Sequence, residues 1–303
     1  MNNKVITIVV TYKRKELLSK VLNAIANQTH LPEKVLVIDN NSNDGTQELV
    51  EEIKKTSSLE ITYFNTGANL GGAGGFKFGI QKTAELKPDY IWLMDDDLVP
   101  DDTCLERLIS VADSNTICQP LRKNLDGSCA EYSPTVYNLS SPFILRPKQE
   151  TVVDYINQKI SEIIPLQGIP FEGPLIPASL VDKIGLPDDR FFIFYDDLDY
   201  AIRARKAGYS INCVVNANAT RLLLNNQTQD LSSWKGYFML RNFFRIHRLH
   251  GENFLVRNRP LAITVIYVIK EFFKNNRTAC KICIDAYKDH LDHDFKITRK
   301  YIP

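Results

Sequence analysis

The chain has 303 residues, of which 44% are hydrophobic and 24% are charged, and these proportions exclude wholesale disorder. Its 37 Lys and Arg residues balance 36 Asp and Glu residues, which argues against a nucleic-acid binder driven by bulk positive charge. Six scattered cysteines form no disulfide framework and no signal-peptide pattern is present, so we expect a reduced, cytoplasmic protein.

The charge is unevenly distributed along the chain. Residues 230–303 contain 14 Lys and Arg against 7 Asp and Glu, a net charge of +7, whereas residues 1–229 carry 23 against 29, a net charge of −6. A basic tail behind an acidic body predicts contact with an anionic surface such as the inner face of the plasma membrane. A basic helical face that is merely solvated is the alternative, and both stay open here.

The first hundred residues alternate between short apolar runs and amphipathic segments. Runs of strand length occur at Val5–Val10, Val35–Ile38, Ile61–Phe64 and Tyr90–Met94. Helices are predicted between them, at Leu17–Ile25, from the turn Asn40–Gly45 through Lys55, and at Gly74–Leu86. Continuous apolar strands alternating with amphipathic helices predict an α/β fold with a mostly parallel, Rossmann-like sheet covered by helices on both faces.

The pattern weakens between Pro120 and Pro177, where proline and serine are frequent and only short extended pieces are expected. A helix is predicted over Asp196–Ala207 and ended by Gly208. From Trp234 onward the chain is typical of helices, with a break expected around Arg259–Pro260. We therefore predict an α/β domain of residues 1–225 and a helical carboxy-terminal region of residues 226–303, which would contact an acceptor, a membrane or a second subunit of a homo-oligomer.

Polar residues follow the ends of the four predicted strands, at Thr11–Tyr12, Asp39–Asn40, Asn65–Gly75 and Asp95–Asp97. Ligands of open α/β sheets bind beyond these carboxyl ends. The glycines of Asn65–Gly75 (NTGANLGGAGG) allow close approach of a ligand, and the helix start after them favours a phosphate. A plain surface loop is the alternative. The spacing matches neither GxGxxG nor a P-loop, which disfavours a dinucleotide fold or a P-loop ATPase.

Three adjacent carboxylates, Asp95, Asp96 and Asp97, end the fourth predicted strand. They repel one another unless a cation neutralises them. On an extended chain Asp95 and Asp97 point to one side and Asp96 to the other. Two hard oxygen ligands on one side predict a site for Mn²⁺ or Mg²⁺ that bridges to substrate phosphates. A solvated acidic loop is the alternative.

A second acidic cluster, Asp196, Asp197 and Asp199, follows an aromatic run at the start of a predicted helix. Carboxylates beside aromatic bulk are partly desolvated, which suits a general base. The alternative assigns Asp196 or Asp197 to capping the helix and Asp199 to an i,i+4 pair with Arg203. We accept a structural role for Asp199, but we do not assign such a role to both Asp196 and Asp197.

The order of five motifs, VTYKR, IDNNSNDGT, NLGGAGGF, YIWLMDDD and FYDDLDYAIRARKAGY, resembles glycosyltransferase family 2 over roughly residues 4–210. The resemblance implies a GT-A fold and an inverting, metal-dependent transfer from a nucleotide sugar. With WKGYFMLRN at Trp234–Asn242, the chain is similar within that family to bacterial galactofuranosyl- and rhamnosyltransferases.

The resemblance also implies roles for individual residues. Thr11 and Tyr12 would line the nucleotide pocket, and Asp39 would accept the ring N–H of uracil or thymine. The other implied roles are ribose and pyrophosphate contacts for Asn69, Gly71 and Gly72, a ribose or sugar contact for Asp96, metal ligation by Asp95 and Asp97, and base catalysis by Asp197, the second acid of the Asp196–Asp197 pair.

Two features leave alternatives open. Many family members place a metal-binding His about twenty residues after the base, but Ala217–Asn226 has none and the next is His247. Water or an Asn fills that position, or metal binding is weaker, or activity is impaired. The rings of Trp234 and Tyr237 form either an acceptor-binding wall or ordinary core packing.

The sequence therefore predicts an inverting transferase for cell-wall or other polysaccharide biosynthesis. Galactofuranose or rhamnose is favoured as the sugar, a UDP- or dTDP-sugar as the donor, and a cell-surface glycan or its lipid-linked precursor as the acceptor. The alternatives are a nucleotidyltransferase, which also uses paired carboxylates and a metal, and a catalytically impaired homologue that binds nucleotide sugars or carbohydrate.

Overall fold

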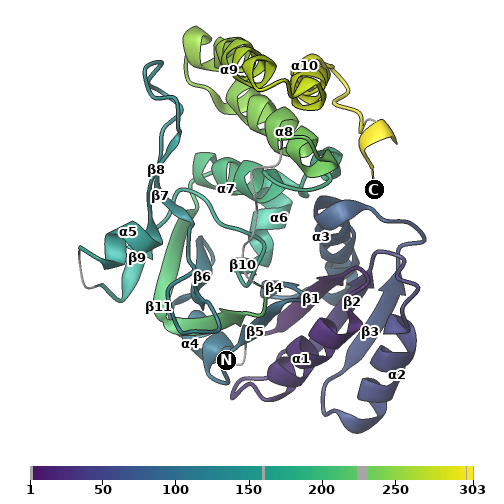
Figure 1. The fold of residues 1–303 in the computed structure, drawn as a ribbon. Coiled ribbons are helices and arrows are strands. Elements are labelled where there is room, and N and C mark those ends of the chain that lie inside the picture. The colour runs from purple at the N-terminus through teal and green to yellow at the C-terminus, as the bar shows by residue number, and fades with distance from the viewer. Residues whose placement is uncertain (1–2, 159–160, 224–230, 298, 303) are drawn as a thin grey trace.

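The structure is a computed structural model that describes residues 3–158, 161–223, 231–297 and 299–302 (Figure 1). Its main sheet has nine strands among these residues, in the order β3-β2-β1-β4-β10-β6-β11-β5, with β9 beside β11. A separate hairpin joins β7, Pro134–Tyr137, to β8, Lys148–Thr151, and is followed by the short helix α5, Val152–Ile156.

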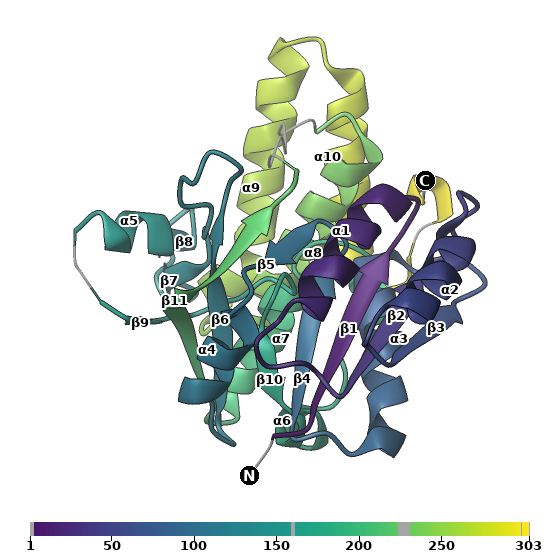
Figure 2. The ribbon, with the colours of Figure 1, turned by 90° about the horizontal axis from the view of Figure 1, so that it is seen from below.

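The first half of the sheet is parallel, as the sequence predicts. Its strands are β1 (Val5–Thr11), β2 (Lys34–Asp39), β3 (Ile61–Asn65) and β4 (Tyr90–Asp95). The intervening helices are α1 (Lys15–Ala26), α2 (Thr46–Thr56) and α3 (Gly71–Thr83), and a 3₁₀ turn at Ala84–Leu86 extends the last of these. Figure 2 shows β2, β1 and β4 side by side.

Alternate residues of the buried strands serve two cores, one on each face of the sheet. Val5 and Val9 of β1 pack with α1, α2 and α4 (Cys104–Val111), whereas Ile6 and Ile8 pack with α3, α6 (Ala178–Ile184) and α7 (Asp196–Lys206). Because both faces are covered, the strands are apolar at nearly every position.

The second half of the sheet is mixed in direction. The strands are β5 (Leu98–Pro100), β6 (Thr116–Lys123), β9 (Ile163–Pro165), β10 (Leu175–Pro177) and β11 (Ser210–Arg221). β10 runs antiparallel between β4 and β6, and β11 runs parallel to β6. The short pieces expected after Pro120 are present, but the long strands β6 and β11 were not predicted. Polar side chains such as Gln119 and Arg122 are buried on β6 and hide its strand pattern.

The carboxy-terminal part consists of α8 (Trp234–His250), α9 (Phe254–Phe273), α10 (Arg277–His290) and a 3₁₀ turn at Arg299–Tyr301. The break predicted around Arg259–Pro260 is wrong, because α9 runs through Pro260. A proline removes one helical N–H, and packing of the whole helix outweighs that loss. The interruptions come instead where Asn253 and Asn276 cap the next helix through their side chains.

Helices α8 to α10 pack on one another and lie beyond α7, away from α1 and α2 (Figure 1). Their shared core includes Phe192, a residue of the loop that precedes α7. The predicted boundary between residues 225 and 226 falls within 224–230, outside the described residues, so the division into two domains stays a prediction.

Candidate active site

The carboxyl ends of the first four strands bring the predicted donor-site residues to one edge of the sheet. In the strand register Thr11 lies opposite Asp39, Val10 opposite Asp95, and Asp39 opposite Asn65. The strand order 3-2-1-4 reverses between β1 and β4, which is where α/β sheets open a ligand crevice.

Asp96 is held by the end of β1. Its Oδ2 accepts from the Thr11 hydroxyl at 2.8 Å and from the Tyr12 N–H at 3.4 Å, and its Oδ1 lies 3.1 Å from Arg14 Nη1. The side chain is nearly fully buried. Asp96 therefore holds the carboxyl end of β1, the end that would face a nucleotide.

Asp95 and Asp97 have a different neighbour, Glu172, on the loop that leads into β10. Burial and then Glu172 raise the pKa of Asp95, and the same causes raise the pKa of Asp97 to about 6. Arg14 lies 3.5 Å from Asp97 and compensates this negative charge only in part. β4 ends at Asp95, and Asp96 and Asp97 lie in the turn before β5, so the extended chain on which the predicted alternation rests stops at Asp95. Arg14 Nη1 contacts both Asp96 and Asp97.

The chemistry of this pair fits a divalent cation. Two adjacent carboxylates whose charge is poorly compensated supply the hard oxygens that Mn²⁺ and Mg²⁺ prefer, and such ions retain waters and bind substrate phosphates. Within the described ranges, however, no group of three or more His, Cys, Asp and Glu side chains is arranged to hold a metal. His247, the histidine nearest in sequence, is buried in α8 with Nδ1 2.9 Å from the Phe243 carbonyl.

Asp39, the predicted partner of the uracil or thymine ring, is fully buried and already accepts two hydrogen bonds. Ser42 N–H donates to Oδ1 at 2.9 Å and the Tyr63 hydroxyl donates to Oδ2 at 2.6 Å. Burial and then Asp39 raise the pKa of Tyr63, so its hydroxyl stays a donor. A carboxylate has about four acceptor positions, so a ring N–H could share one of these oxygens.

The glycine-rich turn is shaped by Gly71, whose φ is +70°. A Cβ there would lie 2.2 Å from the Phe192 carbonyl oxygen, so only glycine fits. Asn69 Oδ1 accepts the Gly71 N–H at 3.0 Å, and Phe192 O accepts the Ala73 N–H at 3.1 Å. Two of the first N–H groups of α3 are thus used inside the protein, so the predicted phosphate contact depends on the open side of Gly72.

The second acidic pair begins α7. Asp196 is buried and Asp197 is half-buried, with Oδ1 accepting the Leu198 N–H at 2.7 Å. Burial is the largest cause that raises the pKa of Asp197 to about 6, and Glu172 raises it further. Burial and then Asp197 raise the pKa of Asp196. Asp197 is therefore the more accessible acid, and its pKa suits proton transfer near neutral pH.

Three aromatic residues immediately before this pair adopt the left-handed backbone region. Phe192, Phe194 and Tyr195 have φ values of 65°, 64° and 67°. Each such residue costs on the order of 1–3 kcal/mol and persists only when its surroundings impose it. The segment 191–195 is called the aromatic loop below.

Asn242 of α8 imposes that conformation. Its Nδ2 donates to the carbonyls of Phe191, Ile193 and Phe194 at 2.9, 2.7 and 3.0 Å, and its side chain is fully buried. The neighbouring Arg241 donates to the Arg190 carbonyl at 3.1 Å and stacks on Phe295. The Arg-Asn pair that ends WKGYFMLRN therefore positions Asp196 and Asp197, a role that the sequence alone does not reveal.

Replacing Asn242 with alanine is expected to lower the free energy of unfolding by about 1–3 kcal/mol, because one buried and two partly buried carbonyls lose their donor. Asn242→Asp should be at least as harmful, since a carboxylate cannot donate to them. Urea unfolding measures both. The exposed Asn258→Ala is the matched control and should change stability by less than about 0.5 kcal/mol. A loss at Asn242 no larger than the control's would contradict the assigned role.

Glu172 joins the two acidic clusters, and sequence reasoning missed it. Arg122 donates to Glu172 and, in a bidentate pair at 2.7 and 2.9 Å, to the fully buried Glu131. Arg221 Nε lies 3.2 Å from Glu172 Oε2, the same oxygen that Arg122 contacts. A signal was present in the sequence, because Glu172 is the one charged residue between Glu162 and Asp182.

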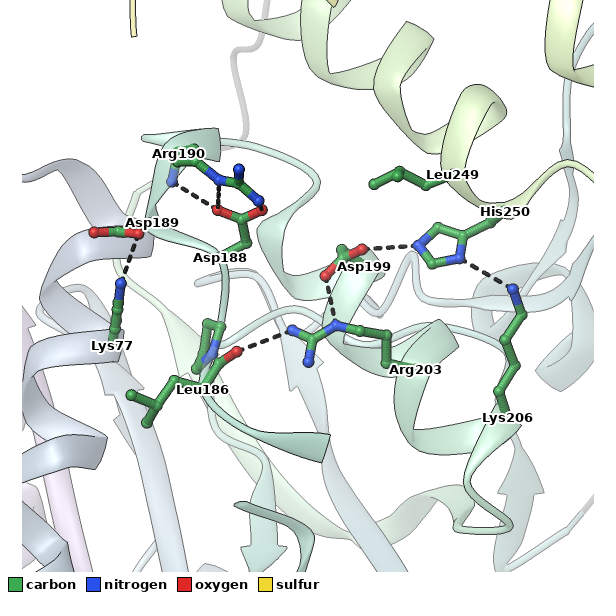
Figure 3. Close-up of a pocket in the computed structure, with 11 residues that line it drawn as sticks. Lys77, Leu186, Asp188, Asp189, Arg190, Asp199, Arg203, Lys206, Leu249 and His250 are labelled. Carbon is green, nitrogen blue, oxygen red and sulfur yellow. Dashed lines mark hydrogen bonds and ion pairs between the residues drawn. The ribbon is translucent and has the colours of Figure 1, made fainter. Parts of the chain in front are cut away.

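Asp199 takes the structural role predicted for it. Its Oδ2 lies 2.8 Å from Arg203 Nε, and its Oδ1 lies 2.7 Å from His250 Nε2 (Figure 3). Lys206 Nζ approaches His250 Nδ1 at 3.2 Å, and an ammonium only donates, so the imidazole proton is on Nε2. These residues line a hollow of about 660 Å³ whose charges are largely paired, and they tie α7 to α8.

The two predicted acceptor rings have different surroundings. Tyr237 is fully buried, its hydroxyl donates to Asp289 Oδ2 at 2.6 Å, and its ring stacks on Tyr301. Tyr237 is therefore a core residue and does not form an acceptor-binding wall. Trp234 is half-buried, with its ring against Phe192 of the aromatic loop. Only Trp234 of this pair can therefore present a ring to a ligand.

Comparisons with known proteins agree with this arrangement. Residues 6–161 match the family model Glycosyl transferase family 2. Galactofuranosyltransferase GlfT1 of Mycolicibacterium smegmatis is 31% identical over 225 residues, which cover 71% of this chain and 69% of that protein.

Solved structures show the same fold. GalNAc-T7 with UDP, GalNAc and Mn²⁺ matches with a TM-score of 0.59 and 14% identity over 80% of this chain, which spans about half (51%) of that chain. Mannosyltransferase PcManGT from Pyrobaculum calidifontis, in complex with GDP-Man and Mn²⁺, matches with a TM-score of 0.57 and 14% identity over 94% of this chain and 74% of that one.

The curled, mostly parallel sheet with flanking helices corresponds to the fold predicted from the sequence. The chain therefore belongs to glycosyltransferase family 2 and has the GT-A fold.

Proposed function

We propose that this protein is an inverting glycosyltransferase that uses a UDP- or dTDP-sugar. The observation that carries the proposal is the pair of acidic clusters, Asp95–Asp97 and Asp196–Asp197, which Glu172 links by raising, beyond the effect of burial, the pKa of Asp95, Asp97 and Asp197. In the proposed transfer one acidic cluster would deprotonate the acceptor, and the other would hold a divalent cation that offsets the negative charge of the donor's diphosphate.

In the proposed reaction Asp197 accepts the proton of an acceptor hydroxyl. That oxygen forms a bond to the anomeric carbon of the sugar while the bond from this carbon to the diphosphate oxygen breaks. Attack from the face opposite the diphosphate inverts the anomeric centre. Asp196, which is buried beside Asp197, and the Asn242-held aromatic loop keep the base in place.

Asp95 and Asp97 are the residues that would hold Mn²⁺ or Mg²⁺. When bound, such an ion supplies Lewis-acid stabilisation of the charge that develops on the departing diphosphate. Thr11, Tyr12 and Asp39 would receive the nucleotide, with Asp96 bracing the end of β1 and Asn69, Gly71 and Gly72 near the ribose and pyrophosphate.

The sugar proposed first is galactofuranose, because the relative with 31% identity is a galactofuranosyltransferase. Rhamnose is the second candidate. The proposed acceptor is a cell-surface glycan or its lipid-linked precursor, extended at the cytoplasmic side of the membrane. The six free cysteine thiols are consistent with a reducing compartment.

The test is transfer from a panel of nucleotide sugars in the presence of Mn²⁺. We expect UDP-galactofuranose to give the largest thermal stabilisation and the fastest turnover, and the product to have the opposite anomeric configuration to the donor by NMR. Retention of configuration would contradict the inverting mechanism. Binding of a donor with neither transfer nor hydrolysis would instead identify a catalytically impaired homologue. The reason to include this outcome is that Ala217–Asn226 contains no His.

A further inference from the structure

The outward side of α9 is apolar, the reverse of an ordinary surface helix. Of the twenty exposed large apolar side chains in the described ranges, α9 contributes eight, here called the α9 face: Phe254, Leu255, Leu261, Val265, Ile266, Ile269, Phe272 and Phe273. Their exposed fractions run from 49% to 82%. Polar residues of the same helix, including Arg259 and Glu271, are buried instead. Contiguous exposed patches of this kind mark interaction surfaces.

The exposed charged residues along α9 and α10 are all basic. Between residues 254 and 291 six basic residues are exposed and no acidic one is, a set here called the basic rim: Arg257, Lys270, Lys274, Arg277, Lys281 and Lys288. Lys274 pairs with the buried Glu271, and the others add positive charge along α9 and α10. Residues 254–291 contain seven Lys and Arg against three Asp and Glu, and so carry +4 of the net +7 charge of residues 230–303.

We propose that the α9 face lies flat on an anionic phospholipid bilayer. Apolar side chains would enter the boundary between headgroups and acyl chains while the basic rim contacts lipid phosphates, the combination that interfacial helices use. A helix of 20 residues is about 30 Å long, so the contact extends along its whole length. Among the described helices none is long and apolar enough to cross a membrane.

The charge of the basic rim favours a bilayer over a second copy of the chain as the partner of the α9 face. In a symmetric dimer the same patch faces itself, so the exposed basic residues would meet their own copies, with no exposed acidic residue between positions 254 and 291 to neutralise them. Like charges brought together out of water repel strongly. An anionic bilayer neutralises the same rim, and its attraction depends on lipid charge and on ionic strength.

Flotation of the full chain with lipid vesicles tests the proposal, and it requires no transfer activity. We expect binding to vesicles of phosphatidylcholine mixed with phosphatidylglycerol, little binding to phosphatidylcholine alone, and weaker binding at high salt. The double variant Phe272→Ser, Phe273→Ser should reduce the bound fraction at least about tenfold, because two large side chains lose their insertion energy. The equally exposed pair Leu125→Ser, Phe143→Ser, on other elements, is the matched control and should bind as the native chain does.

Charge reversal gives an independent arm that leaves the apolar face intact. Lys270→Glu with Lys281→Glu should abolish the preference for anionic vesicles, whereas Lys20→Glu with Lys55→Glu on α1 and α2 should not. Equal binding to neutral and anionic vesicles would overturn the proposal. So would native dimers in light scattering that dissociate in the Phe272→Ser, Phe273→Ser variant without lipid, because a second copy would then cover the face.

Discussion

Asp197→Asn is expected to lower turnover by about 10²–10⁴-fold, the usual contribution of a general base, while the donor dissociation constant stays nearly unchanged. The carboxylate would act on the acceptor hydroxyl and not on the diphosphate, which explains the separation of the two constants. Asparagine keeps the shape of the side chain and its acceptor oxygen for the Leu198 N–H, so the start of α7 should remain intact.

Transfer rate and donor binding are measured for Asp197→Asn and for Asp196→Asn, its neighbour on the same helical turn. Asp196 is buried, so its variant should disturb stability more than chemistry. Loss of turnover in Asp196→Asn alone would move the base by one residue. Native rates in both variants would make this cluster structural and would remove the proposed mechanism.

The pH profile gives a second readout of the same residue. The base must be ionised, and burial raises its pKa to about 6. Below that pH kcat/KM should fall about tenfold per unit as Asp197 is protonated, and above it the profile should level off. In Asp197→Asn this acidic limb should disappear. A limb that persists in the variant would assign it to another group, with Asp97, whose pKa burial likewise raises to about 6, the first candidate.

Loss of metal-dependent donor binding is the second large effect, expected for Asp95→Ala and Asp97→Ala. Removal of an outer-shell partner costs about 10–100-fold in metal affinity, so removal of a ligand should cost more than that. Asp96→Ala should behave differently, because Asp96 holds Thr11, Tyr12 and Arg14. We expect it to weaken UDP binding to a similar degree with and without Mn²⁺.

Calorimetric titration of UDP, with Mn²⁺ and with EDTA, separates these effects. Asp102→Ala, which removes an exposed carboxylate nearby in sequence, is the matched control and should bind as the native chain does. An equal, metal-dependent loss at all three aspartates would contradict the assignment of the cation to Asp95 and Asp97 without Asp96. Native Mn²⁺-dependent binding in both of their variants would place the cation elsewhere.

The sequence by itself determined the first half of the sheet and the chemistry of its edge. Val5–Val10 and Tyr90–Met94 are apolar at every position except Thr7, because strands buried on both faces need apolar side chains. This local pattern can be read without a structure. The polar residues that follow these runs, Thr11 and Asp95–Asp97, could therefore be placed at one edge in advance. The pairing of Asp199 with Arg203 was also local, since residues four apart on a helix are neighbours.

Only the tertiary structure decided what depends on contacts between distant segments. Glu172 meets the two acidic clusters because the loop before β10 folds back beside β4, and Asn242 reaches the aromatic loop from a helix about fifty residues later. The apolar pattern of α9 gives no sign of which side faces inward, because Arg259 and Glu271 are buried where apolar residues would be expected. Periodicity reports that a helix has two faces, and only packing against α8 and α10 determines which of them meets water.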